Sequence, residues 1–246
     1  MTPPDSILVI NAASPSVCSD DEVRHYVAAI QDFLPEFNRA WGLPEVDVAF
    51  MPHGQAIPKG FGHLQVIADD SDQAEALGYH EVAEDGFPIG YTFAKTGRAG
   101  GNSISGTLTH EIWEARVNPM IDRQVSGPDG RRWDLEVADA VEADEWGIRW
   151  PMPNGPDVLL SDFCLPGYYD FAAPWDDRGY DYRGLLKRPI PEMLPGGYLA
   201  FQEPGGRWGQ VDAFGSDRRA RARARPLPLS RRYRAMLRSW QTSYNP

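Results

Sequence analysis

Hydrophobic and polar positions in the first half of the chain predict alternating strands and helices. Residues 6–13 (SILVINAA) are a short, nearly continuous apolar run, which is typical of a buried strand. Residues 46–51 and 64–68 are further short apolar segments, and prolines bracket the first of them. Each of the three is predicted to be a strand.

A long amphipathic helix is predicted between the first two of these strands. Apolar side chains recur at spacings of three and four over residues 23–41, the pattern of one buried helix face. Ser19 followed by Glu22 fits a capping box at its start, and Gly42 is a typical stop at its end. Pro35 predicts a kink or a split, because proline removes a backbone N–H and crowds the preceding turn.

A further strand and a second helix complete the pattern of the first half. Residues 87–93 (FPIGYTF) predict a strand at a sheet edge, since Pro88 and Gly90 would weaken a central strand. Residues 103–117 predict a helix that ends before Pro119, because proline disfavours helical geometry in the residue before it. The order strand, helix, strand, strand, edge strand, helix predicts an α+β or α/β fold, a sheet lying under helices.

The regular pattern fades in the second half, which suggests three parts. We predict an α+β domain at residues 1–150 and a loop-rich extension, 151–217, packed on it. Proline, glycine and aromatic residues dominate the extension, with short strands predicted at 197–202 and 208–214. Residues 218–246 are predicted to form an Arg-rich C-terminal arm.

Charged residues are divided unevenly between residues 1–217 and this arm. The chain has a formal net charge of −11, yet nine arginines lie between Arg218 and Arg238. Such a stretch can neutralise nucleic-acid phosphates or dock on an acidic protein surface. Because Tyr233, Leu237 and Trp240 lie among and next to these arginines, we favour contact with another protein.

Membrane insertion, secretion and disulfide bonding have no signal in the sequence. No apolar run approaches the roughly 18–20 residues that a membrane span needs. The N-terminal residues lack the basic region of a signal peptide. Cys18 and Cys164 are predicted to be buried thiols, since two distant cysteines do not make a disulfide framework.

The helix at 103–117 carries the candidate chemistry, His110-Glu111-Ile112-Trp113-Glu114. His110 and Glu114 are four residues apart and therefore share one helix face. Imidazole nitrogen and carboxylate oxygen are ligands for one divalent metal, with zinc as the first candidate. Glu111 lies beside the first ligand, where a general base stands in metallopeptidases. In the alternative interpretation, His110 and Glu114 merely hydrogen-bond each other on a partly buried helix.

This string is similar to the His-Glu-x-x-His helix of zincin peptidases, with Glu114 in place of the second histidine. In the thermolysin-like gluzincins, the third ligand is a glutamate further along the chain. An aspartate within a turn of it orients a ligand histidine. Glu136 lies 26 residues beyond His110, in Leu135-Glu136-Val137-Ala138-Asp139. The resemblance therefore implies Glu136 as the third metal ligand and Asp139 as the residue that orients a ligand histidine.

A wider resemblance covers residues 60–200. The segments ALGYH (76–80), LTHEIWEARVNP (108–119), LEVAD (135–139) and SDFCLP (161–166) look like a set of zincin-like proteins of tailed bacteriophages and prophages, mostly uncharacterised or virion-associated. The later PGGY (195–198) is similar to the same set. The resemblance implies a zincin-like fold with a metal held by His110, Glu114 and Glu136.

Other histidines and tyrosines have less specific patterns. His80 is interpreted as structural, with lining of the cleft as the alternative. His63 lacks ligand spacing and is predicted to be a loop residue, as is His53. Tyr168 and Tyr169 can stabilise an oxyanion, but aromatic packing is the favoured role.

Two functions remain open on the sequence. The first is a structural, virion-associated metal-binding protein with weak or lost peptidase activity, because two glutamates and one histidine make the metal a weaker Lewis acid. The alternative is an active zinc metallopeptidase that uses Glu111 as general base on a peptide substrate. In both, we expect a protein made in the bacterial cytoplasm and placed in a phage or phage-like particle. Its arm would contact other particle proteins, and nucleic acid is the less favoured partner.

Overall fold

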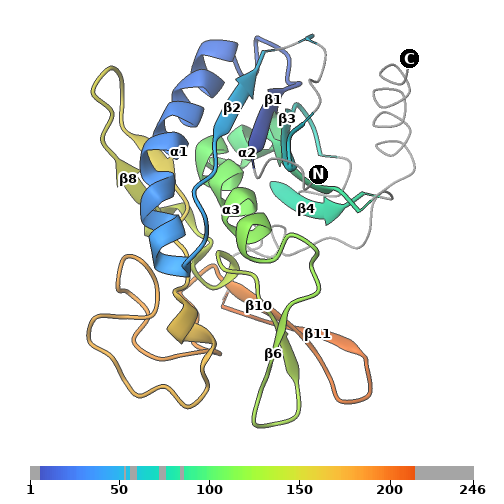
Figure 1. Cartoon of the computed structure of the whole chain (residues 1–246), viewed down its shortest axis with the longest axis vertical. Coiled ribbons are helices and arrows are strands. Elements are labelled where there is room, and N and C mark those ends of the chain that lie inside the picture. The colour runs from blue at the N-terminus through green and yellow to red at the C-terminus, as the bar shows by residue number, and fades with distance from the viewer. Residues whose placement is uncertain (1–5, 53, 56–59, 72–75, 84–85, 214–246) are drawn as a thin grey trace.

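A five-stranded sheet with helices packed against it forms one half of the molecule (Figure 1). The computed structural model describes residues 6–52, 54–55, 60–71, 76–83 and 86–213. The predicted Arg-rich arm and His53 lie outside the described residues. The sheet has the order β2-β1-β3-β5-β4. Its strands are β1 (Ile7–Asn11), β2 (Val48–Met51), β3 (His63–Ala68), β4 (Gly78–Val82) and β5 (Pro88–Phe93).

The direction of the strands makes this a mixed sheet with one antiparallel edge. β1 pairs in parallel with both β2 and β3, and β3 pairs in parallel with β5. β4 alone runs antiparallel, with Tyr79 opposite Tyr91 and His80 opposite Gly90 of β5. The predicted strands at 6–13, 46–51, 64–68 and 87–93 are confirmed, whereas β4 was not predicted.

The predicted edge position of residues 87–93 is wrong, because β5 lies between β3 and β4. Pro88 is the first residue of β5, a position where a strand tolerates proline. Gly90 is needed inside the sheet for space: a Cβ there would lie 2.2 Å from Oε1 of Gln65 on β3. An internal strand therefore accommodates both residues, Pro88 by its position at the strand start and Gly90 by its lack of a side chain.

Helix α1 (Asp20–Trp41) joins β1 to β2 and begins and ends where the sequence predicts. The Ser19 side chain accepts a hydrogen bond from the Glu22 backbone N–H, and Gly42 closes the helix in a left-handed conformation, φ 63°. The predicted split at Pro35 is wrong, since the helix continues through it. Proline inside a helix costs about 3 kcal/mol. Burial of Leu34 and Phe37 on either side offsets this, at roughly 1.5–3 kcal/mol for each side chain.

Two helices follow β5. The glycine-rich stretch after Phe93 forms a short helix, α2 (Ala94–Gly100), that the sequence analysis did not predict. Helix α3 (Ile104–Val117) is confirmed, with the Ser103 hydroxyl accepting a hydrogen bond from the Gly106 N–H at 3.0 Å. α3 packs against β4 and β5 on one side and against α1 and β9 (Val158–Leu160) on others.

The second half of the chain adds small antiparallel sheets and short 3-10 turns. A four-stranded sheet, with the order β11-β10-β7-β6, projects from the end opposite the first sheet (Figure 1). Strands β10 and β11 confirm the predictions at 197–202 and, as far as Asp212, at 208–214. The remaining elements are β6 (Gln124–Ser126), β7 (Arg132–Asp134), η1 (Asp139–Val141), η2 (Asp144–Trp146), β8 (Ile148–Trp150), which pairs with β9, η3 (Pro166–Tyr169), β10 (Tyr198–Gln202) and β11 (Trp208–Asp212).

The main hydrophobic core is shared by both halves. Phe33 and Phe37 of α1, Trp113 of α3 and Phe163 of the second half are fully buried and in ring contact. Trp113 stacks on Phe37 with ring centroids 4.5 Å apart. The coarse prediction of a mixed helix-and-sheet fold is therefore confirmed, and residues beyond 150 help to close its core.

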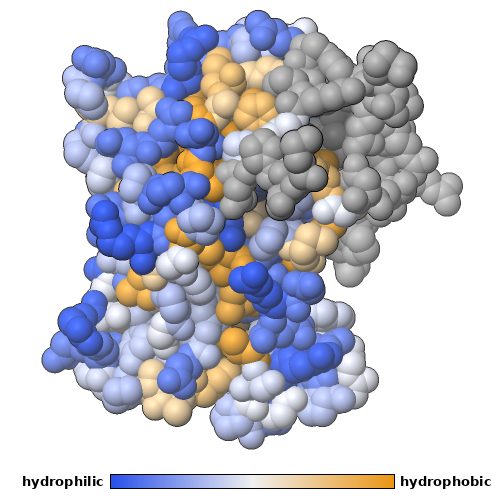
Figure 2. All heavy atoms as spheres, in the orientation of Figure 1, coloured by the Kyte–Doolittle hydropathy of each residue, from blue (hydrophilic) through white to orange (hydrophobic). Residues whose placement is uncertain are grey.

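The state of the two cysteines agrees with the prediction from the sequence. Cys18 and Cys164 are buried free thiols, as predicted. No helix in the described ranges has the length and hydropathy of a membrane span. Figure 2 shows hydrophilic residues over much of one face, with hydrophobic residues gathered in a band through its middle.

Candidate metal centre

Helix α3 holds its polar residues in the interior instead of on a solvated face. Twelve of its fourteen residues are buried, because neighbouring elements surround it on several sides. Thr109 Oγ1 accepts a hydrogen bond from the Ser161 N–H at 2.7 Å, and Trp113 Nε1 donates to the Ser161 carbonyl at 3.2 Å. These contacts fix the rotation of α3, which directs its histidine and glutamates into one pocket.

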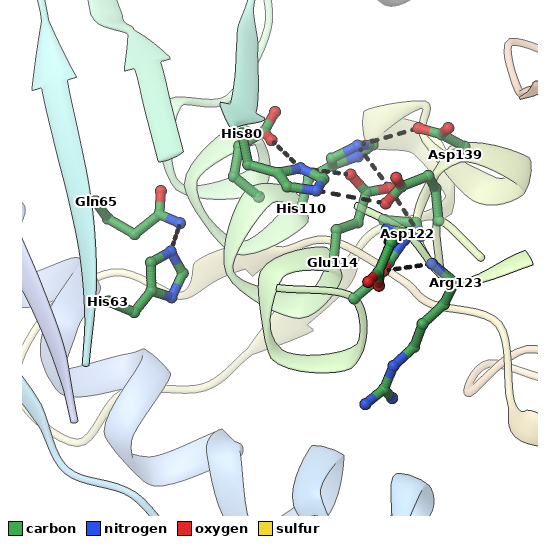
Figure 3. Close-up of polar contacts among 12 residues, drawn as sticks. His63, Gln65, His80, His110, Glu114, Asp122, Arg123 and Asp139 are labelled. Atoms are coloured by element: carbon green, nitrogen blue, oxygen red, sulfur yellow. Dashed lines mark hydrogen bonds and ion pairs between the residues drawn. The ribbon is translucent and has the colours of Figure 1, made fainter. Parts of the chain in front are cut away.

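Six buried histidine and carboxylate side chains meet in this pocket, from β4, α3 and the segment that precedes and enters η1. Figure 3 labels four of them, His80, His110, Glu114 and Asp139. The pocket has a volume of about 710 Å³, part of it open to solvent. All six side chains are buried, and none of the residues is more than 8% exposed. They are His80, His110, Glu111, Glu114, Glu136 and Asp139.

One group of donors surrounds His110. Its Nε2 lies 3.2 Å from Glu114 Oε1 and 3.3 Å from Asp139 Oδ1. These three residues offer ligand atoms that all lie within 4.8 Å of one another. Asp139 Oδ1 is a buried atom that faces His110, which directs this carboxylate into the group.

A second group surrounds His80, which reaches into the pocket from the edge strand. Its Nδ1 lies 3.3 Å from Glu111 Oε2 and 3.3 Å from Glu114 Oε2. These three residues also offer ligand atoms within 4.8 Å of one another. The other ring nitrogen of His80, Nε2, faces Glu136 Oε2 at 3.6 Å.

The electrostatics of the pocket reflect the crowding of these charges. Burial by itself lowers the pKa of His80, but the charge of Glu136 and hydrogen bonds with neighbouring glutamates raise it to about 10. Burial also opposes charge on His110, yet the charge of Glu114 and the contact with Asp139 raise its pKa well above the usual value. Burial and the charge of Glu114 raise the pKa of Asp139 to about 7. Without a cation, the pocket therefore holds protons, which a metal ion would displace.

The structure brings all five sequence-predicted site residues together, in an arrangement that differs in detail from the expected one. Asp139 was expected to orient a ligand histidine, but it contacts the same His110 nitrogen as Glu114 does. Glu136 was expected to join His110 as a ligand, and its ion-pair contact is with His80. Glu111 was expected to be a general base and not a ligand, and it shares His80 Nδ1 with Glu114.

His80 is the residue whose place sequence reasoning missed. It was interpreted as structural, and the alternative, lining of the cleft, is the one that the structure shows. Its strand was not predicted, so its contacts with α3 were not expected. The available signal was Gly78 two residues earlier: a Cβ there would lie 2.7 Å from Glu111 Oε1, so only glycine lets this strand approach the helix.

The remaining candidates have structural roles. Tyr168 and Tyr169 are buried in η3 and donate their hydroxyls to backbone carbonyls, those of Glu192 and Glu136 respectively. This agrees with the favoured packing role. The prediction of a loop position for His63 is wrong: it is buried as the first residue of β3, with Nε2 2.9 Å from Gln65 Nε2 (Figure 3).

The donor set fits a first-row divalent ion. Imidazole nitrogen with carboxylate oxygen suits zinc, iron or manganese, and neither group of donors contains a thiolate. Comparisons of the chain with protein-family models, curated proteins and solved structures found no match.

Proposed function

We propose that this protein binds a divalent metal ion, with zinc as the first candidate, in a zincin-like site centred on His110 and Glu114. One observation carries the proposal: two histidines and four carboxylates are buried together in a single pocket. Burying a charge that is not paired is costly, and four adjacent carboxylates also repel one another. A divalent cation offsets both costs, which explains why such a pocket exists inside the protein.

The surroundings of the site support the zincin-like part of the proposal. In zincins, a helix with a His-Glu pair packs against a sheet whose edge strand lies along the cleft. Here α3 carries His110-Glu111, and the antiparallel edge strand β4 lines the same pocket through Gly78, Tyr79 and His80. β4 thus takes the place that the sequence analysis had given to residues 87–93.

We place this metal site in a structural protein of a phage or phage-like particle, with weak or lost peptidase activity. The support is the anionic donor set and the resemblance of residues 60–200 to zincin-like phage and prophage proteins, mostly uncharacterised or virion-associated. Each carboxylate donates charge to the cation and lowers its strength as a Lewis acid. Particle proteins are the proposed partners, through the Arg-rich arm.

A second candidate, a metal-dependent peptidase, is favoured by the position of Glu111. Its carboxylate is buried in the same pocket as His110 and Glu114, beside the edge strand. A bound divalent ion would supply Lewis-acid activation of a peptide carbonyl and of water. Glu111 would accept a proton from that water at Oε2, with His80 Nδ1 holding this oxygen in place at 3.3 Å.

Metal analysis of the purified protein tests the proposal. Protein prepared without chelator, or dialysed against zinc, is expected to hold metal by mass spectrometry, and His110→Ala is expected to reduce the content. His25→Ala is the matched control, because His25 lies on α1 and contacts the Pro156 carbonyl, away from the pocket. Wild-type protein that takes up no metal would refute the proposed function.

Cleavage of peptides separates the two candidates. Glu111→Gln keeps the size of the side chain and removes the proton acceptor, a loss of about 10²–10⁴ in rate for an enzyme. A structural protein is expected to cleave unfolded substrates in neither form. Cleavage by the wild type, abolished in Glu111→Gln, would establish the peptidase instead.

A further inference from the structure

Glu114 lies between the two groups of donors and belongs to both. Its Oε1 faces His110 Nε2 at 3.2 Å, and its Oε2 faces His80 Nδ1 at 3.3 Å. One carboxylate therefore points one oxygen at each histidine. This is the position of a carboxylate that bridges two cations.

With Glu114 counted in both, each of the two groups supplies three possible metal ligands. His110 and Asp139 lie on one side, and His80 and Glu111 lie on the other. Apart from Glu114, the two sets have no member in common. If one ion binds to one of these sets, the histidine and carboxylate of the other set remain available for a second ion.

The charge of the pocket also matches two ions better than one. Glu111, Glu114, Glu136 and Asp139 carry four negative charges when ionised, and the histidines are neutral when they bind metal. One divalent ion balances two of these charges and leaves the other two to be balanced by protons or by a second cation, since unpaired charges are costly in a protein interior. Two divalent ions neutralise all four.

Glu136 completes the second site by orienting its histidine. It faces His80 Nε2 at 3.6 Å, the nitrogen opposite the one shared by Glu111 and Glu114. A carboxylate on the far nitrogen of a ligand histidine fixes the orientation of the ring and raises its basicity. At 3.6 Å this contact is an ion pair and not a hydrogen bond, so Glu136 would act on His80 through its charge.

We propose that the pocket binds two divalent cations bridged by Glu114, one held with His110 and Asp139 and the other with His80 and Glu111. This rests on the proposed function, that the pocket binds metal, and adds the second ion. Carboxylate-rich sets with one histidine per ion suit manganese or iron as well as zinc. Glu111 then serves as a ligand of the second ion, which explains its contact with His80.

Metal stoichiometry of the wild type tests the proposal directly. Chelator-treated protein would be titrated with Mn²⁺, and the bound metal counted by mass spectrometry after removal of free ion. Two ions per chain are expected, with an electron paramagnetic resonance spectrum of a coupled pair. One ion per chain with an isolated-ion spectrum would overturn the second site and leave the proposed function standing. No bound ion, either in this titration or after dialysis against zinc, would refute both.

Two variants assign the ions to their donors. His80→Gln is expected to lose the second ion and Asp139→Asn the first, so each would retain one ion per chain and lose the coupled spectrum. Glu36→Gln is the control and is expected to bind two, since Glu36 is partly exposed on α1 and paired with Arg39. Two ions still bound to His80→Gln, with coupling intact, would overturn the assignment. If either variant fails to fold, the wild-type stoichiometry and spectrum still decide the proposal.

Discussion

Gly78→Ala tests whether the close approach of β4 to α3 builds the metal site. A Cβ at position 78 would lie 2.6 Å from the Tyr91 carbonyl oxygen, 2.7 Å from Glu111 Oε1 and 2.7 Å from Thr107 Cγ2. Ordinary contacts begin near 3.4 Å, so the strand must move away by about 0.8 Å, the difference between 3.4 and 2.6 Å. The carbonyl oxygen belongs to the backbone of β5 and cannot turn aside, and therefore β4 itself has to shift.

The shift should reduce both stability and metal binding. Overpacking of this kind costs about 1–3 kcal/mol. For a protein of this size each kcal/mol lowers Tm by about 2–4 °C, so we expect a loss of roughly 2–12 °C. His80, two residues along the strand, moves with it. Metal sites tolerate only about 0.2 Å of error in ligand distance, so we expect metal affinity to fall about 10-fold or more.

Thermal unfolding followed by circular dichroism, and competition with a metal chelator, measure the two effects. Gly205→Ala is the matched control, since a Cβ there meets nothing within 4 Å. If Gly78→Ala and Gly205→Ala melted at the same temperature and bound metal equally, β4 would not be held against α3 as described.

Two further predictions concern the core around Ser161. Trp113→Ala is expected to lower the free energy of unfolding, measured with denaturant, by about 3–5 kcal/mol. The reason is that the ring is fully buried, stacks on Phe37 and donates to the Ser161 carbonyl. A loss below about 1 kcal/mol would contradict this packing. Burial, with the hydrogen bond and charge of Asp181, raises the pKa of Asp162 to about 9, so the folded state keeps a proton that the unfolded chain releases near pH 4. The stability of the wild type should therefore fall as pH rises from about 4 to 9. Asp162→Asn should remove this part of the pH dependence when Tm is measured across the same range. A variant whose Tm depends on pH as the wild type's does would refute the prediction.

Local signals in the sequence were sufficient for the helices that carry and support the site. Ser19 and Gly42 set the bounds of α1 because caps act through neighbouring backbone groups. The four-residue spacing of His110 and Glu114 placed both on one side of α3, whatever surrounds that helix. Each inference depended on residues within about one helical turn of each other.

The rest of the site depends on contacts between distant segments, which spacing along the chain does not reveal. β4 exists because Gly78 to Val82 pair with residues 88–92 of β5, and its short sequence has no clear alternation of polar and apolar residues. His80 meets Glu114 only because that strand lies at the edge beside α3. The relative positions of Glu136 and Asp139 are set by an irregular segment entering η1, where neither helical nor strand periodicity applies.

The contacts of Ser161 also set the order in which the protein can mature during its synthesis. Ser161 holds α3 through Thr109 and Trp113, and Tyr198 hydrogen-bonds Asp139 in the pocket. A nascent chain that has left the ribosome only as far as residue 150 has the His-Glu helix but lacks the segments that fix its rotation and complete its surroundings. We therefore expect stable metal capture to require segments beyond residue 150.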